Sequence, residues 1–158
     1  MIKNYPTHIV ATGGFVTNPQ GQVLLLKSPR YGDWEFPGGQ VEESETIPHA
    51  LEREVFEETG IIVRVKSLVG IYSNTRKPSI VNLDFICKYV SGEPRPSIES
   101  TEVKWVDRAE ALSWVKREAV YKRLKNMLAF SGEITYGAYF VDPNRIDLNY
   151  RELEERKI

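Results

Sequence analysis

Three glutamates stand close together near the end of a predicted helix. They are Glu54, Glu57 and Glu58, in the stretch REVFEETG. Helical residues advance by about 100° each, so the three carboxylates share one face, and Gly60 is a typical helix stop just beyond them. Like charges at this spacing cost roughly 0.2–0.5 kcal/mol per pair, and the helix dipole disfavours negative charge at this end. Two interpretations remain open: a solvated acidic face partly neutralised by Arg53, or a site for a hard cation such as Mg²⁺ or Mn²⁺.

The sequence around these glutamates, residues 39–61, favours the second interpretation. It reads GQVEESETIPHALEREVFEETGI, with Glu45 after Gly39 and five further residues, and Arg53 after seven more. This spacing resembles the Nudix box at every position that the family defines, and the preceding WEFPGG resembles the family's usual lead-in. The resemblance implies an α/β fold, the Nudix α/β/α sandwich, in which a mixed, curved sheet lies between helices.

The resemblance also implies roles for individual residues. The implied ligands of Mg²⁺ or Mn²⁺ are Glu54, Glu57, Glu58 and a backbone carbonyl at Gly39. Arg53 would orient a helix carboxylate or Glu45, and Glu45 would support the loop without touching the metal. Because the carboxylates repel one another until a cation binds, we expect metal to stabilise the folded protein.

Nudix enzymes hydrolyse a nucleoside diphosphate linked to a further group, by attack of water at a phosphorus atom. A bound cation lowers the pKa of water, so the protein must supply positioning and one base. We expect Glu57 to be this base. Glu102, just before a predicted strand, is the alternative, because the family often has an acidic ligand or base there. Glu99 is a second alternative, and an exposed, solvated position is the other interpretation of both loop glutamates.

Substrate choice depends on residues outside the box. Arg30 and Arg76 could bind phosphate and Trp34 could stack on a base, although surface cations are usually solvated and strand aromatics usually pack in the core. We expect a nucleoside triphosphate, normal or oxidised, with ADP-ribose or a nucleotide sugar as the alternative. An RNA 5′ end is a third choice. A Nudix-fold module that binds a nucleotide without hydrolysing it is a candidate from another class.

Hydrophobic patterns and turn residues predict the elements that position these groups. Strands are predicted at 8–16, 23–26, 61–65, 81–90, 102–106 and 134–140, the first two forming a hairpin. A helix is predicted from Thr46, which with Ser44 is a candidate N-cap, to residue 59. A second helical region, with or without a break, should run to about residue 130 from a capping box at Asp107 and Glu110. A polar tail follows.

Composition limits the remaining possibilities. With 158 residues, 41% apolar and 27% charged, the chain is predicted to form one domain over 1–158, with 131–158 as a C-terminal extension. A formal charge of -1 argues against a stable nucleic-acid partner. A single cysteine, Cys87, excludes an intrachain disulfide and favours a reducing, cytoplasmic setting. No stretch approaches the roughly 20 apolar residues of a membrane span. We therefore expect a small-molecule nucleotide as partner and no membrane, and the resemblance allows a homodimer.

Overall fold

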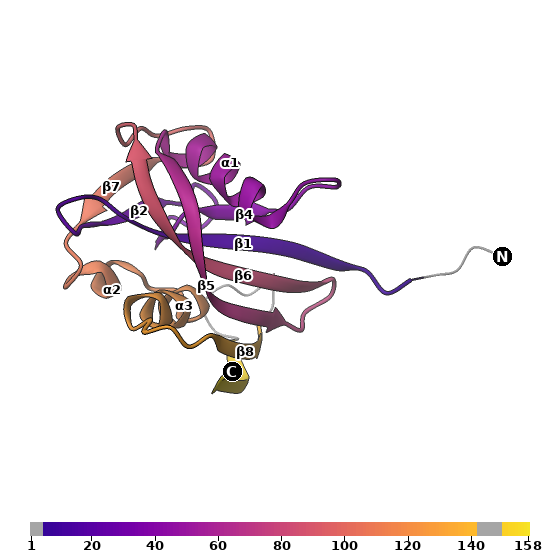
Figure 1. Ribbon diagram of the computed structural model, residues 1–158. Coiled ribbons are helices and arrows are strands. Elements are labelled where there is room, and N and C mark those ends of the chain that lie inside the picture. Colours follow the sequence, from indigo (N-terminus) through magenta and orange to yellow (C-terminus); the bar gives the residue numbers. More distant parts are fainter. Residues whose placement is uncertain (1–4, 142–149) are drawn as a thin grey trace.

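The protein is described by a computed structural model that covers residues 5–141 and 150–158. Within these residues a mixed sheet of nine strands lies between α1 on one face and α2 and α3 on the other (Figure 1). The helices are α1 (Ile47–Thr59), α2 (Ala111–Trp114) and α3 (Glu118–Leu128). The α/β/α arrangement predicted from the sequence is confirmed.

The strands follow the order β3-β2-β1-β6-β5-β8-β9 across the sheet, with β4 paired to β1 and β7 paired to β2. Their bounds are β1 (His8–Thr17), β2 (Val23–Lys27), β3 (Trp34–Glu35), β4 (Gly38–Gln40), β5 (Ile62–Asn74), β6 (Ser79–Ser91), β7 (Glu102–Val106), β8 (Thr135–Phe140) and β9 (Arg151–Lys157). The pairs β1–β6 and β5–β8 are parallel, and the other pairs are antiparallel.

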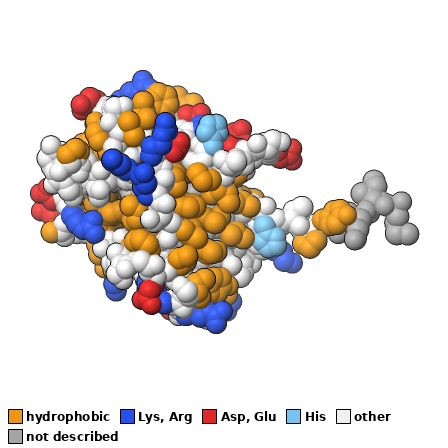
Figure 2. Space-filling model, in the orientation of Figure 1, with side chains coloured by type: hydrophobic (Ala, Val, Ile, Leu, Met, Phe, Trp, Pro, Cys, Tyr) orange, Lys and Arg blue, Asp and Glu red, His pale blue; other side chains and the backbone are white. Residues whose placement is uncertain are grey.

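Both faces of the sheet are packed at its centre. Successive strand residues point to opposite faces, so Leu24 joins α1 in one core cluster while Leu25 joins α3 in the other. The VLLL run is fully buried for this reason, and the predicted hairpin of β1 and β2 is confirmed. Near the start of β6, Val81 and Leu83 are only half-buried. Hydrophobic side chains gather on the surface below α1 in Figure 2.

The helix that carries the acidic cluster begins and ends where local signals place it. Thr46 is its N-cap with extended backbone, Pro48 lies in its first turn, and Gly60 ends it with φ of 75°. That left-handed conformation favours glycine. Within the described residues Thr46 forms no side-chain capping bond, so its contribution is conformational.

The second helical region is broken between α2 and α3, at residues 115–117. The Asp33 carboxylate accepts hydrogen bonds from the backbone N–H groups of Lys116 (3.3 Å) and Arg117 (3.0 Å), and so caps the start of α3 from a distant loop. The predicted capping box does not form. The Asp107 side chain instead accepts a bond from Gln22 at 3.2 Å, and α2 begins without a side-chain cap.

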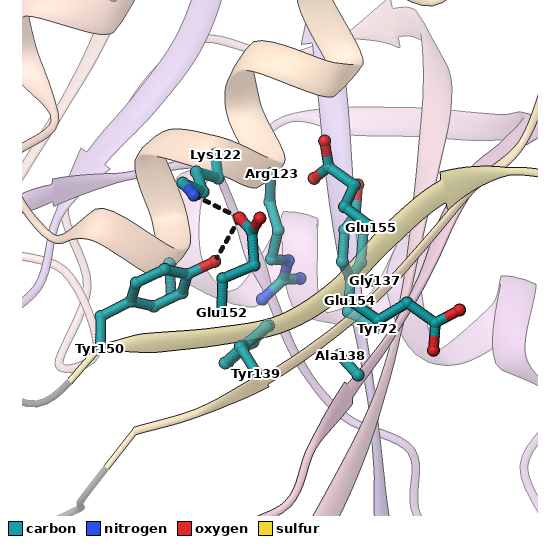
Figure 3. A pocket seen from close by; sticks show the side chains of 11 residues that line it. Tyr72, Lys122, Arg123, Gly137, Ala138, Tyr139, Tyr150, Glu152, Glu154 and Glu155 are labelled. Carbon is teal, nitrogen blue, oxygen red and sulfur yellow. Dashed lines mark hydrogen bonds and ion pairs between the residues drawn. The ribbon is translucent and has the colours of Figure 1, made fainter.

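The predicted tail is polar, but residues 151–157 form a strand that was not predicted, β9, at the edge of the sheet beside β8. Polar contacts hold this strand against α3: Lys122 binds Glu152 (Figure 3), and Asn126 donates to Glu155 at 3.1 Å. Residues 142–149 of the predicted tail lie outside the described part of the chain. No helix in that described part is long and apolar enough to cross a membrane.

Candidate active site

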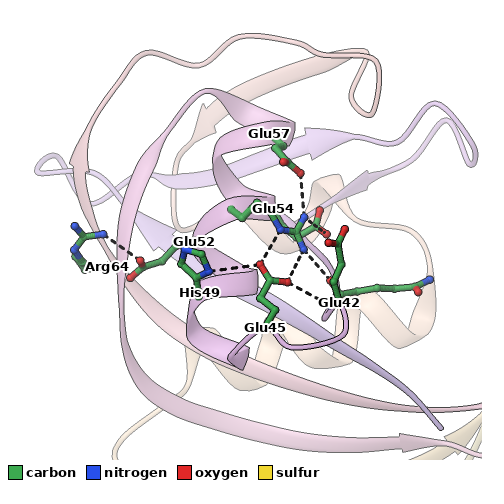
Figure 4. A network of polar contacts seen from close by, with 9 residues as sticks. Glu42, Glu45, His49, Glu52, Glu54, Glu57 and Arg64 are labelled. Carbon is green, nitrogen blue, oxygen red and sulfur yellow. Dashed lines mark hydrogen bonds and ion pairs between the residues drawn. The ribbon is translucent and has the colours of Figure 1, made fainter. Parts of the chain in front are cut away.

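Arg53 lies at the centre of the acidic face of α1. Its Nε and Nη2 each donate to one oxygen of Glu45, both at 2.9 Å, and its Nη1 donates to Glu54 at 2.9 Å and to Glu57 at 3.0 Å (Figure 4). The guanidinium hydrogen bond holds the pKa of Glu45 well below its usual range, at about 2. One arginine therefore orients the loop glutamate and two helix glutamates together.

A third carboxylate joins Glu54 and Glu57 from a loop far along the sequence. Oxygen atoms of Glu54, Glu57 and Glu99 all lie within 4.8 Å of one another. The turn that carries Glu99 is tied to the end of α1, because the Ser100 hydroxyl donates to the backbone carbonyl of Glu58 at 2.6 Å. The three glutamates form what we call the carboxylate cluster.

Glu102 lies elsewhere. It begins β7 directly opposite Lys27 of β2, and its carboxylate contacts Lys27 at 3.1 Å and Lys104 at 3.2 Å. The hydrogen bond from Lys27 and then that from Lys104 lower the pKa of Glu102. Its negative charge is thus matched by two lysines, and the structure brings Glu99 to the carboxylate cluster in its place.

Glu58 points toward the segment before α1. It accepts a hydrogen bond from the Gly38 backbone N–H at 2.8 Å. Burial, together with the nearby carboxylates of Glu35 and Glu54, raises the pKa of this carboxyl to about 9, although the hydrogen bond from Gly38 acts in the opposite direction. Burial also raises the pKa of Glu54. Negative charge is disfavoured here without a counter-charge, and the all-carboxylate donor set suits a hard cation such as Mg²⁺ or Mn²⁺.

Gly39 allows β4 to run against this acidic face. A Cβ atom at Gly39 would lie 2.3 Å from the carboxyl carbon of Glu54, closer than atoms can approach. The strand is held in place by pairing with β1, where Gly39 faces Thr12. Gly38 and Gly39 therefore belong to a short strand whose backbone adjoins Glu54 of the carboxylate cluster.

A cavity of about 150 Å³ is lined in part by Gly38 and Gly39, whose backbone adjoins Glu58 and Glu54. It lies between the sheet and α3. The residues that line it are Ala11, Thr12, Glu35, Phe36, Gly38, Gly39, Asn82, Val120 and Arg123. A ligand that extends from the cluster into this cavity would meet polar groups of β3, β6 and α3.

None of the three side chains expected to bind substrate lines this cavity. Trp34 packs edge-on against Trp114, with ring centroids 4.9 Å apart, and belongs to the core on the α3 side. Arg30 is exposed and lies over Tyr31. Arg76 lies in the turn between β5 and β6.

The sequence interpretation did not identify Arg123, Asn82 or the buried Asp84 that binds Arg123. Asn82 and Asp84 could have been identified from the sequence, because they are two polar residues on one side of an otherwise apolar strand.

Comparisons with known proteins agree with this fold. The NUDIX domain model matches residues 7–130. A MutT-like protein of Streptomyces ambofaciens is 45% identical over 101 residues, which are 64% of this chain and 65% of that protein. An ADP-ribose pyrophosphatase of Methanocaldococcus jannaschii is 35% identical over 115 residues, 67% of this chain and 68% of that protein. The crystal structure of a MutT protein from Bacillus halodurans superposes with a TM-score of 0.70 at 29% identity, covering 94% of this chain and 97% of that one.

The matched family model and the relatives define the class of protein, a hydrolase of phosphorus-containing anhydrides. The chain belongs to the Nudix hydrolase family.

Proposed function

We propose that this protein is a divalent-cation-dependent pyrophosphohydrolase that cleaves the diphosphate linkage of a nucleoside triphosphate, in normal or oxidised form. The observation that carries the proposal is the carboxylate cluster of Glu54, Glu57 and Glu99, which Gly39 of β4 connects to the cavity. Phosphates at the cluster and a base in the cavity fit one extended nucleotide. A reducing cytoplasmic setting suits this substrate class and the free Cys87.

Glu54, Glu57 and Glu99 would hold the cation, with Glu58 and the Gly39 carbonyl as the remaining candidates. When bound there, Mg²⁺ or Mn²⁺ neutralises phosphate charge and makes a water molecule more acidic. Glu57 is half-exposed and fixed by Arg53, so it can receive the proton of the attacking water. Arg53 orients this base without touching the substrate.

A second candidate function is hydrolysis of ADP-ribose or a nucleotide sugar. It is favoured by the similarity to the Methanocaldococcus jannaschii ADP-ribose pyrophosphatase. Both functions use the same cluster and differ in what occupies the cavity. A module that binds a nucleotide without hydrolysing it is less well supported, because Arg53 holds two carboxylates of the cluster, Glu54 and Glu57, in place.

The test is a panel of nucleoside triphosphates, 8-oxo-dGTP, ADP-ribose and nucleotide sugars, incubated with Mg²⁺ or Mn²⁺, with products identified by mass. Glu57→Gln should reduce turnover by about a hundredfold or more. Glu43→Gln, at an exposed position of the loop before α1, is the matched control and should retain wild-type activity. Nucleotide binding without turnover by the wild type would reject the enzyme in favour of the binding module. Light scattering on the same samples tests the expected homodimer.

A further inference from the structure

The turn that carries Glu99 is closed by hydrogen bonds between the residues on either side of it. The Ser97 backbone N–H donates to the Ser100 carbonyl at 3.0 Å, and the Ser100 N–H donates back to the Ser97 carbonyl at 3.4 Å. The two residues at the tip project from the protein, since Ile98 is 96% exposed and Glu99 is also exposed. Core packing does not hold Glu99 at the carboxylate cluster, so its position depends on polar contacts.

The two serine hydroxyls form a chain of hydrogen bonds that has one direction. The Glu99 backbone N–H donates to Ser97 Oγ at 3.0 Å, and Ser100 Oγ donates to the Glu58 carbonyl at 2.6 Å. A hydroxyl has a single proton, so Ser97 is the donor in the contact between the two Oγ atoms, which lie 3.4 Å apart. The chain therefore runs from the Glu99 backbone through both serines to the Glu58 backbone, at the end of α1.

Ser100 is the buried member of this chain. It is 0% exposed, whereas Ser97 is exposed. Besides the Ser97 hydroxyl, Ser100 Oγ accepts the Ser97 backbone N–H at 3.1 Å. The proton and both acceptor positions of the Ser100 hydroxyl are then in use. Because a buried hydroxyl cannot turn without losing one of these bonds, the protein itself fixes its orientation.

The loop before β7 supplies partners that the end of α1 lacks. The last four carbonyls of a helix have no intrahelical donor. Here the Glu58 carbonyl accepts from the Ser100 hydroxyl, and the Thr59 carbonyl accepts from the Arg95 backbone N–H at 2.9 Å. The Arg95 guanidinium also lies over the Phe56 ring, 5.4 Å from its centroid. The turn is therefore held at a fixed place relative to the two cluster glutamates on α1.

We propose that Ser97 and Ser100 are positioning residues for the divalent cation and act through Glu99. They hold the turn where oxygen atoms of all three cluster glutamates lie within 4.8 Å of one another. Mg²⁺ requires oxygen ligands at about 2.0–2.1 Å, so a small displacement of the turn would remove Glu99 from the ligand set. In this role neither serine touches the cation or the substrate. The inference rests on the proposed function, since it assumes that the cation binds at the carboxylate cluster.

A purely structural role would have a different signature. If the serines only supplied hydrogen bonds to the end of α1, their loss would lower the melting temperature and leave the cation affinity of the folded protein unchanged. A positioning role requires that the affinity falls, and that the fall depends on the Glu99 carboxylate. Both quantities are measured without substrate.

The test measures Mn²⁺ binding by electron paramagnetic resonance, which reports the free ion, together with the melting temperature in EDTA. Ser100→Ala should weaken Mn²⁺ binding about tenfold, the lower end of the usual cost of losing a group that orients a metal ligand. Ser97→Ala should also weaken it, because the Glu99 N–H loses its acceptor. Thr101→Val is the matched control and should keep the wild-type affinity, since this hydroxyl of the same loop donates to the Lys27 carbonyl of β2.

A double-mutant cycle shows whether the serines act through Glu99. In a Glu99→Gln background, Ser100→Ala should change the Mn²⁺ affinity by less than about twofold, because the carboxylate that it positions is already absent. An equal loss of affinity in both backgrounds would overturn the positioning role. A lowered melting temperature with wild-type affinity in Ser100→Ala would also overturn it, in favour of the structural role.

The outcomes separate this inference from the proposed function. Wild-type Mn²⁺ affinity in both serine variants, with turnover intact, would overturn the inference alone. Mn²⁺ binding without turnover by the wild type would overturn the proposed function, and the affinities of the variants would still decide the role of the serines. A wild type that binds no Mn²⁺, and no Mg²⁺ by calorimetry, would overturn both. If Ser100→Ala does not fold, Ser97→Ala decides by the same criteria, because Ser97 is exposed.

Discussion

The Arg53 guanidinium and the Glu45 carboxylate meet through two parallel hydrogen bonds of equal length, 2.9 Å each. Nη2 of the same side chain also reaches the backbone oxygen of Gln40 at 3.2 Å, and Nη1 is left for Glu54 and Glu57. The planar fork of arginine makes all these contacts at once, which the single ammonium group of lysine cannot do. Arg53 therefore joins the loop before α1 to the carboxylates that would bind metal.

Replacing Arg53 by lysine should lower kcat/KM about 10- to 100-fold, the usual cost of losing a residue that orients metal ligands. The charge is kept, so the loss would come from geometry. Steady-state kinetics at several Mg²⁺ concentrations measure it. Arg64→Lys is the control, because Arg64 forms an exposed ion pair with Glu52 on another part of α1. Equal losses in both variants would show that the lost activity does not depend on the position of Arg53.

The lowered pKa of Glu45 predicts a pH dependence of stability. In the unfolded chain a glutamate titrates near 4.3, whereas hydrogen bonding to Arg53 lowers the folded pKa to about 2. The ionised form thus stabilises the fold above about pH 4.3, and this contribution is lost as the pH falls toward 2. Melting temperatures in EDTA should be higher for wild type than for Glu45→Gln at pH 7, and the difference should shrink by pH 3. A difference that grows on acidification would contradict the assignment.

The two loop glutamates should behave differently. Glu99 belongs to the carboxylate cluster, so Glu99→Gln should reduce activity by about tenfold or more and raise the Mg²⁺ concentration needed for half-maximal rate. The Glu102 carboxylate forms ion pairs with Lys27 and Lys104. Because exposed ion pairs contribute little, Glu102→Gln should change the rate less than about threefold. The two variants are one another's control. The reverse order of effects would restore Glu102 as the site residue.

The reactivity of Cys87 measures how often the core beneath α1 opens to solvent. Its side chain packs against Leu51 and Val55 of α1, and burial raises the pKa of the thiol to about 12. Because the thiolate is the reactive form, iodoacetamide at pH 8 should label the native protein at least about 100-fold more slowly than the denatured chain. Mass spectrometry follows the reaction. Fast labelling of the native protein would show that α1 does not seal this part of the core.

The same labelling reports on metal binding. A cation that binds only the folded form stabilises it by about 2.7 kcal/mol at 100 times its dissociation constant. Adding Mg²⁺ should therefore slow the labelling of Cys87, and Ca²⁺-free buffer with EDTA should restore the original rate. A labelling rate that millimolar Mg²⁺ and Mn²⁺ do not change would argue against a cation site at the cluster.

Sequence reasoning succeeded where the signals are local. Pro48 and Gly60 mark the two ends of α1 within the helix's own sequence, and the predicted bounds agree with the observed ones. The predicted strands all form, and 102–106 has the observed bounds of β7. Others are longer than predicted: β5 extends to Asn74 through two bulges that hydrophobic alternation does not reveal. Box spacing likewise placed Arg53 among its carboxylates.

Sequence reasoning failed where a structural feature depends on a residue far away in the sequence. The capping of α3 depends on Asp33, in a loop before β3, and no pattern near residue 117 indicates it. The sequence RELEERK has no apolar alternation, so β9 is held by polar contacts that become apparent only in three dimensions. Glu99 and Glu102 are three positions apart, and only the register of β7 against β2 decides which of them reaches the cluster.

The parallel pairing of β1 with β6 also bears on how the chain acquires its structure. The Thr12 hydroxyl bonds to the carbonyl of Leu83, 71 positions later, at the centre of the sheet. During synthesis β1 must therefore wait for the β6 segment, and the apolar VLLL strand beside it remains uncovered in the meantime. Contacts of such long sequence separation slow folding, so we expect refolding in milliseconds to seconds rather than microseconds. The nascent N-terminal half is the stage at which this protein most needs protection from aggregation.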